Sequence, residues 1–185
     1  MELWHNRILV LDFGSQYTQL IARRIREAQV YSQILPCTAS LATILAYRPQ
    51  GIVLSGGPSS VYEKKAPAVA KELFEQGIPI LGICYGMQLV THLSGGKVVK
   101  APHREYGRAD LLIDDRSDLF KGIGTGGSSV VWMSHGDRID RMPPGFRSIA
   151  HTSNSPVAAM KSEDEQSRIY CLQFHPEVAH TPEGA

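Results

Sequence analysis

One short turn constrains the fold of this 185-residue chain more than any other segment: Gly82-Ile83-Cys84-Tyr85-Gly86. An apolar run over residues 79–83 ends there, and a helical pattern over residues 85–94 begins at once. A strand that turns directly into a helix needs small neighbours on both sides, which Gly82 and Gly86 supply. The pattern predicts that the Cys84 side chain projects from the sheet end, where helix N–H groups favour a thiolate.

Apolar runs and helical patterns alternate through the first half of the chain. Strands are expected at residues 8–13, 32–36, 51–55 and 79–83, and helices at 17–28, 41–47, 66–76 and 85–94. Strands that alternate with helices in this way predict a mostly parallel sheet covered on both faces.

The second half has shorter spacing and more turns. Strands are expected at residues 97–100, 109–114, 130–133, 147–152, 157–161 and 169–174, with Gly- and Pro-rich turns at 124–127 and 143–145. This spacing predicts antiparallel hairpins added to the parallel part. The expected fold class is therefore α/β, an open, mostly parallel sheet with helices on both faces and an antiparallel strand extension, in one domain over residues 1–185.

Composition excludes several classes of partner. The formal net charge of +1 argues against a nucleic-acid-binding surface, which needs clustered excess Lys and Arg. No apolar run reaches the roughly 18–20 residues of a membrane span. Three cysteines, Cys37, Cys84 and Cys171, without CxxC spacing disfavour disulfides and zinc, which predicts a reducing, cytoplasmic location.

A cysteine nucleophile needs a base and a group that orients the base, and residues 173–177, Gln-Phe-His-Pro-Glu, offer both. His175 follows an apolar strand, at the rim where open α/β sheets place their sites. Glu177 stands two residues on, so an extended backbone would point both side chains the same way. A zinc site from His175, Glu177 and His180 is an alternative that lacks HExxH or paired-cysteine spacing.

Two further turns contain residues suited to binding. The run Ser55-Gly56-Gly57-Pro58 exposes backbone N–H groups, and the amides of Gly57 and Tyr85 could stabilise an oxyanion. A phosphate cradle and a plain β-turn are the alternatives for this glycine pair. The run Ser134-His135-Gly136-Asp137 follows a predicted strand, and a hairpin turn capped by Asp137 is its plain interpretation.

Taken together, these runs resemble the class I, triad-type glutamine amidotransferases, and within that family the branch found in bacterial GMP synthases. The resemblance covers nearly the whole chain. It rests on residues 10–17 (VLDFGSQY), 54–62 (LSGGPSSVY), 82–88 (GICYGMQ), 104–107 (REYG), 132–137 (WMSHGD) and 173–178 (QFHPEV). The Cys and His-Pro-Glu runs indicate the class, and residues 12–17 and 134–137 indicate the branch.

The resemblance implies a role for each matching residue. Cys84 would be the nucleophile, His175 the general base and acid, and Glu177 the group that orients it. The backbone amides of Gly57 and Tyr85 would form the oxyanion hole. The residues that would hold the amino-acid end of L-glutamine are Gln88, Ser134, Gly136 and Asp137. A flavodoxin-like fold is implied as well.

The family reaction releases ammonia from the glutamine side-chain amide through a cysteine thioester, with no cofactor or metal in this domain. Relatives deliver the ammonia to an ATP-pyrophosphatase unit that uses ATP and magnesium to aminate XMP to GMP. The sequence holds no ATP-site motif. The resemblance therefore implies a fragment that lacks its terminal helix and a downstream synthetase domain.

Three alternatives stay open on sequence alone. A stand-alone γ-glutamyl cysteine hydrolase would share Cys84 and His175. A non-catalytic docking or regulatory module would keep the fold, against which the intact set of Cys84, His175 and Glu177 argues. An amidotransferase domain could also serve another synthetase.

Overall fold

The computed structural model describes residues 7–184, apart from the side chains of residues 102–104. The strands are β1 (Arg7–Asp12), β2 (Tyr31–Pro36), β3 (Gly51–Leu54), β4 (Ile80–Ile83), β5 (Lys97–Ile113), β6 (Ser128–Arg141), β7 (Phe146–His151), β8 (Ala159–Ser162) and β9 (Ile169–Leu172). The helices are α1 (Thr18–Glu27), α2 (Leu41–Ala46) and α3 (Tyr85–Leu93), with a 3₁₀ helix η1 (Lys71–Glu75). All nine strands form one sheet in the order β2-β1-β3-β4-β9-β8-β7-β5-β6.

The first five strands of that order are parallel and buried between helices. Helix α1 packs Ile21 against one face, where it meets Val10 and Val53. On the other face, α2, η1 and α3 bury Ile44, Leu73 and other apolar side chains against the sheet. Helices thus cover both faces, which confirms the expected α/β class. No described helix is long and apolar enough to cross a membrane.

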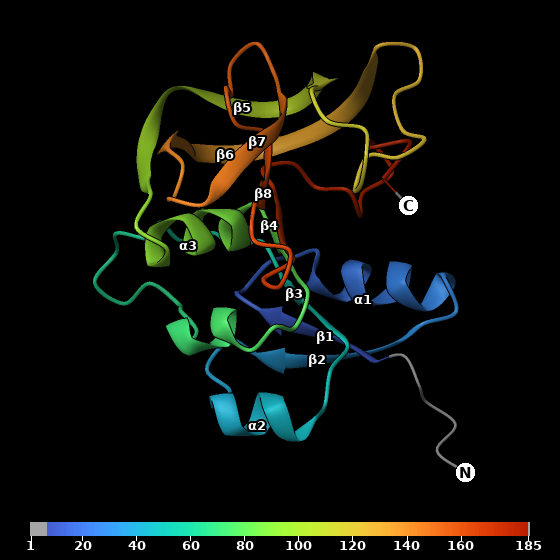
Figure 1. Cartoon of the computed structure of the whole chain (residues 1–185). Helices are drawn as coiled ribbons and strands as arrows, with labels where there is room; N and C mark the ends of the chain where they lie inside the picture. The colour runs from blue at the N-terminus through green and yellow to red at the C-terminus, as the bar shows by residue number, and fades with distance from the viewer. Residues whose placement is uncertain (1–6, 185) are drawn as a thin grey trace.

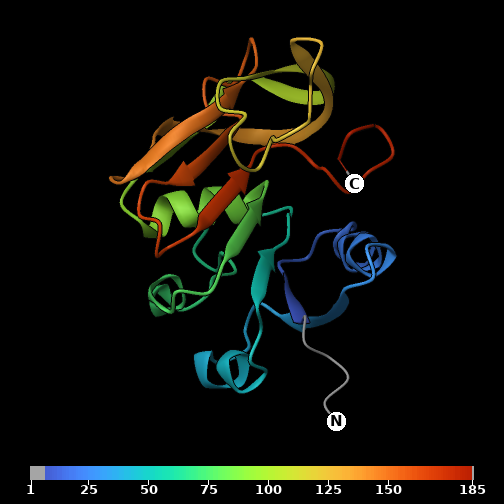
Figure 2. The ribbon, with the colours of Figure 1, turned by 45° about the vertical axis from the view of Figure 1, so that its right-hand side comes forward.

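The remaining strands, β8, β7, β5 and β6, are antiparallel and have an apolar cluster of their own, which includes Val131, Met133 and Ile149. Figure 1 shows β5, β6 and β7 at the top, above the parallel strands and their helices. In Figure 2 the green strand β4 and the red strand β9 lie side by side where the two parts join. The expected antiparallel extension is confirmed.

The helix expected over residues 66–76 is wrong. Residues 66–70 are irregular, and only η1 forms one short 3₁₀ segment. The carbonyl of Pro67 accepts a hydrogen bond from the Tyr85 hydroxyl at 2.6 Å, and Val69 is buried in the core. These contacts hold the segment along the edge of the core, and they outweigh a modest intrinsic preference for helix.

Two further expectations are wrong. Strands were expected at residues 97–100 and 109–114 with a gap between them, and a turn was expected at residues 134–137. Strand β5 runs from Lys97 to Ile113 with a bulge, and β6 continues through Ser134 and Asp137 to Arg141. Each strand supplies the other's backbone partners over this length, so the polar run does not have to turn. In the middle of the sheet, β9 stops at Leu172 rather than at residue 174.

Candidate active site

The predicted strand–turn–helix at Cys84 is present. Cys84 lies between the end of β4 and the start of α3 with φ +52° and ψ −103°, a backbone region that L residues rarely adopt. A Cβ atom added to Gly86 would lie 2.5 Å from the carbonyl oxygen of Leu54. The helix can therefore start against β3 only because residue 86 has no side chain.

The pairing of β4 with β9 brings Cys84 and His175 together. The backbone N–H of Cys84 donates to the carbonyl of Leu172, the last residue of β9, at 2.7 Å. His175 follows three residues later. A Cβ atom built on Gly56 would lie 3.0 Å from Cε1 of His175 and 3.7 Å from Cβ of Cys84. Gly56 therefore lies against both side chains, and its lack of a side chain leaves them room.

His175 and Glu177 form a buried hydrogen-bonded pair, with Nδ1 of the ring 2.7 Å from Oε1 of the carboxylate. The backbone of residues 176–177 forms a turn, so the expectation of an extended segment is wrong although the expected contact is present. Two bonds fix the His175 backbone. Its N–H donates to the Trp132 carbonyl at 3.0 Å, and its carbonyl accepts from Oγ1 of Thr181 at 2.7 Å.

The surroundings of His175 favour its charged form. Burial lowers the pKa of the imidazole, but hydrogen bonds to the Cys84 sulfur and the Glu177 carboxylate outweigh burial and raise the pKa to about 10. A protonated ring beside the sulfur stabilises a thiolate. The arrangement can therefore supply a nucleophile and a proton donor at the same time.

Three residues touch the reacting pair although sequence reasoning gave them no role. Nε2 of Gln173 lies 3.8 Å from the Cys84 sulfur, and the Tyr17 ring meets the His175 ring edge-on with centroids 5.2 Å apart. Gly56 is the third. Tyr17, Gly56 and Gln173 all stand in runs that the sequence singled out, but their contacts depend on which strands are neighbours.

Of the two residues whose backbone amides are expected to stabilise an oxyanion, Gly57 lines the cavity and Tyr85 does not. Gly57 lines the cavity beside Cys84, and a Cβ atom on it would lie 2.5 Å from the Phe13 carbonyl oxygen. Tyr85 is the first residue of α3, where an amide has no acceptor within the helix. Its side chain is buried in the core.

A cavity of about 850 Å³ opens over the Cys84 sulfur. The four residues expected to hold an amino acid all line it, namely Gln88, Ser134, Gly136 and Asp137. The carbonyl oxygen of Ser134 is 3.6 Å from the sulfur. Nε2 of Gln88 donates to the Asp137 carbonyl at 3.1 Å, and the Ser60 hydroxyl donates to the Asp137 carboxylate at 2.7 Å. Asp137 therefore accepts bonds at the cavity wall and caps no hairpin turn.

The residues of the zinc alternative have other partners. The His180 ring packs on Trp132 with centroids 4.4 Å apart, while His175 pairs with Glu177. Within the part of the chain that the structure describes, no group of three or more His, Cys, Asp and Glu side chains is arranged to hold a metal ion.

This fold, with a thiol–imidazole–carboxylate set at the ends of β4 and β9, defines a class of enzyme. The chain belongs to the class I glutamine amidotransferase family, whose family model matches residues 9–185. Sequence comparison identifies similar proteins within this family. The chain is 54% identical over 182 residues to the glutamine-hydrolysing GMP synthase of Wolinella succinogenes, and 54% identical over 184 residues to that of Caldanaerobacter subterraneus.

These alignments cover 96% and 100% of the chain but 34% and 35% of the relatives, so the chain spans about a third of their length. Among solved structures, a Thermoplasma acidophilum protein provisionally described as one subunit of a GMP synthase matches with a TM-score of 0.85 and 32% identity, over 97% of this chain and 88% of that chain. A Thermotoga maritima glutamine amidotransferase shares the fold, with a TM-score of 0.73 and 22% identity over 94% and 77% of the two chains.

Proposed function

We propose that this chain hydrolyses the side-chain amide of L-glutamine and supplies the ammonia to a synthetase unit that aminates XMP to GMP. One observation carries the first half of the proposal. The His175 ring is hydrogen-bonded to the Glu177 carboxylate, and His175 and Cys84 both pack against Gly56 and line one cavity. Family membership and identity to GMP synthases support the second half.

The first step forms a thioester. The Cys84 thiolate attacks the amide carbon of glutamine, and the C=O electrons move onto oxygen as the S–C bond forms. Collapse of this intermediate breaks the C–N bond, and the leaving nitrogen takes the proton of His175. The products are ammonia, a γ-glutamyl thioester and a neutral imidazole, which Glu177 keeps in a fixed orientation.

The second step regenerates the thiolate. Neutral His175 takes a proton from water as the water oxygen attacks the thioester carbon. Collapse breaks the C–S bond, and the thiolate returns beside a protonated ring. The new carboxyl group of glutamate loses its proton to solvent. A ring with a raised pKa suits this cycle, because each turnover begins from the ion pair.

Both steps place negative charge on the former carbonyl oxygen. We assign the amides of Gly57 and Tyr85 to that oxygen, since a single donor of this kind is typically worth about 3–4 kcal/mol of barrier. The amino-acid end of glutamine lies against Gln88, Ser134, Gly136 and Asp137, where the Asp137 carboxylate suits an ammonium group.

The synthetase unit would provide the remaining chemistry. ATP and magnesium activate XMP there, and no cofactor is assigned to the present domain. Direct transfer is needed because ammonia protonated in bulk water is no longer a nucleophile. Such a reaction belongs in the cytoplasm, and the free thiols Cys37, Cys84 and Cys171 are consistent with that location.

The glutaminase proposal is tested by ammonia release from glutamine and by covalent labelling with diazo-oxo-norleucine, a glutamine-like electrophile. The wild type should release ammonia and be labelled at Cys84. Cys84→Ala should lower kcat by at least about 10³-fold and abolish labelling. Hydrolysis of γ-glutamyl peptides in preference to glutamine would instead identify a γ-glutamyl hydrolase, and a folded protein that is never labelled would identify a non-catalytic module.

The choice of synthetase is tested separately. The chain is mixed with an XMP-aminating ATP-pyrophosphatase unit, glutamine, XMP, ATP and magnesium, and GMP is measured. GMP should form with the wild type and not with Cys84→Ala, whereas added ammonium salt should restore GMP formation with the variant. Ammonia release without GMP formation would show that the domain serves another synthetase.

A further inference from the structure

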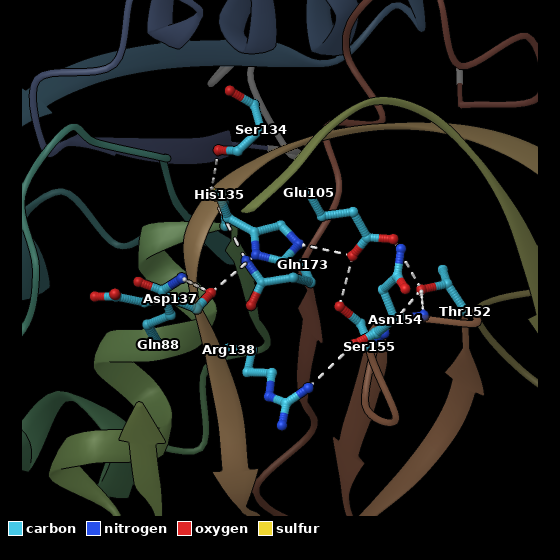
Figure 3. Close-up of polar contacts among 11 residues, drawn as sticks. Gln88, Glu105, Ser134, His135, Asp137, Arg138, Thr152, Asn154, Ser155 and Gln173 are labelled. Atoms are coloured by element: carbon cyan, nitrogen blue, oxygen red, sulfur yellow. Dashed lines mark hydrogen bonds and ion pairs between the residues drawn. The ribbon is translucent and has the colours of Figure 1, made fainter. Parts of the chain in front are cut away.

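A buried contact between a histidine and a glutamate lies at the cavity wall, apart from the set formed by Cys84, His175 and Glu177. Glu105 of β5 and His135 of β6 are direct partners across the ladder, and Nε2 of His135 is 3.2 Å from Oε2 of Glu105. The two side chains are only 9% and 1% exposed. Figure 3 shows them pointing toward each other. A pair this deeply buried is not a solvated surface pair.

Two hydroxyl donors and the His135 ring surround the Glu105 carboxylate. Thr152 donates to Oε1 at 3.0 Å and Ser155 donates to Oε2 at 2.7 Å, while His135 approaches Oε2 (Figure 3). Burial raises the pKa of Glu105, but the bonds from His135, Ser155 and Thr152 outweigh burial and lower it. The cluster is therefore built around a negative charge.

His135 links this charge to the cavity. Its Nδ1 lies 2.9 Å from the carbonyl oxygen of Asp137. A carbonyl oxygen only accepts hydrogen bonds, so Nδ1 is the donor in this contact, and Nε2 is the ring atom that faces the Glu105 carboxylate. The same Asp137 carbonyl accepts from Gln88, and the neighbouring Ser134 carbonyl lies 3.6 Å from the Cys84 sulfur.

The pair also stands where strand register is hardest to maintain. Lys100 pairs with Asp137 and Glu105 pairs with His135, so five steps along β5 match two steps along β6. This bulge adjoins the cavity, since Lys100, Tyr106 and Asp137 line it. A buried pair of polar side chains seldom adds much net stability, and fixing strand register is its best-attested use.

We propose that the buried Glu105–His135 pair is a positioning unit for glutamine binding. It fixes β5 on β6 beside the bulge, and through the Asp137 carbonyl it holds residues 134–137 where the amino-acid end of glutamine binds. Both residues act through others and neither transfers a proton in the reaction. The inference rests on the proposed glutaminase function and adds to it residues behind the binding wall.

The test is Glu105→Gln, which keeps the size of the side chain and removes its charge. Loss of an interaction that substrate and transition state share raises KM and leaves kcat unchanged, so we expect KM for glutamine to rise about tenfold or more with kcat within about twofold. Labelling of Cys84 by diazo-oxo-norleucine at subsaturating concentration should slow by a similar factor. Alkylation by iodoacetamide, which has no amino-acid end, should keep its rate.

The matched control is Asp140→Asn, which removes an exposed ion pair with Lys97 across the same two strands and should leave all four measurements unchanged. Thr152→Val and Ser155→Ala each remove one donor to Glu105, and should raise KM by a smaller factor even if Glu105→Gln fails to fold. An unchanged KM in folded variants, or equal slowing of both electrophiles, overturns the positioning role. A wild type that neither releases ammonia nor reacts with diazo-oxo-norleucine refutes the glutaminase proposal itself.

Discussion

At the scale of single residues, Cys84 has an unfavourable backbone conformation that its position requires. Its φ of +52° and ψ of −103° suit glycine better than any L residue, and strain of this kind typically costs about 1–3 kcal/mol. The surrounding glycines and the β4–β9 pairing hold the residue in place. The strain therefore accompanies a buried side chain that lines the cavity, while stability comes from elsewhere in the core.

This strain predicts a difference between two inactive variants. Cys84→Gly should unfold with a free energy about 1 kcal/mol higher than Cys84→Ala, because glycine relieves the strain and alanine retains it. Urea denaturation of both variants measures the difference. If the alanine variant is equally or more stable, the turn is not strained as the backbone angles indicate.

A second prediction at this scale concerns pH. The pKa of Glu105 is lower in the folded protein than its ordinary value of 4.5, so its contribution to stability is full above about pH 4.5 and is lost as the pH falls through the folded-state pKa. The destabilisation caused by Glu105→Gln should therefore shrink as the pH falls from 5 to 3. Urea unfolding at several pH values measures it, with the exposed Glu72→Gln as control. A constant difference would contradict a buried, charged Glu105.

At the scale of secondary-structure elements, the sequence correctly predicted the features that depend only on neighbouring residues. The turn at Cys84 was predictable because its glycines are required by the backbone itself. The helix expected over 66–76 failed because Pro67 and Val69 bind and pack against distant residues. The turn expected at 134–137 failed for the same reason, since backbone partners from β5 keep the polar run extended.

The junction between β4 and α3 gives the prediction at this scale. Gly86→Ala should lower the free energy of unfolding by about 2 kcal/mol or more, because the new methyl would lie 2.5 Å from the Leu54 carbonyl oxygen. Gly126→Ala is the matched control, since no atom lies within 4 Å of its added Cβ. Thermal unfolding compares the two variants. Equal melting temperatures would show that β3 and α3 can separate at no cost.

At the scale of the whole molecule, the site lies where the parallel and antiparallel parts of the sheet meet. The sequence permitted a contact between Cys84 and His175, because both were predicted to follow strands of one sheet, but it did not show that these two strands are neighbours. The Glu105–His135 contact could not be predicted, since it depends on a register that a bulge shifts. Gln173 and Tyr17 were missed likewise, because only the strand order places them on the reacting pair.

Thr181 connects the antiparallel part of the sheet to the segment that follows β9, and the prediction at the scale of the whole molecule concerns this residue. Its hydroxyl accepts from the Trp132 N–H of β6 at 3.0 Å and donates to the His175 carbonyl. Thr181→Val preserves shape but loses both bonds, so stability should fall by about 1–3 kcal/mol and kcat should fall with it. Urea unfolding and ammonia release are measured beside Thr125→Val, an exposed control. Unchanged kcat in a destabilised variant would show that Thr181 supports the fold alone.

The position of β9 in the sheet also determines when, during synthesis, Cys84 can meet His175 and Glu177. β9 inserts between β4 and β8, although it is the last of the nine strands to leave the ribosome. During synthesis, the chain carries residue 84 for a long interval before residues 175 and 177 exist. A nascent polypeptide therefore cannot consume glutamine until β9 has closed the sheet, and translation itself delays the chemistry until the fold is complete.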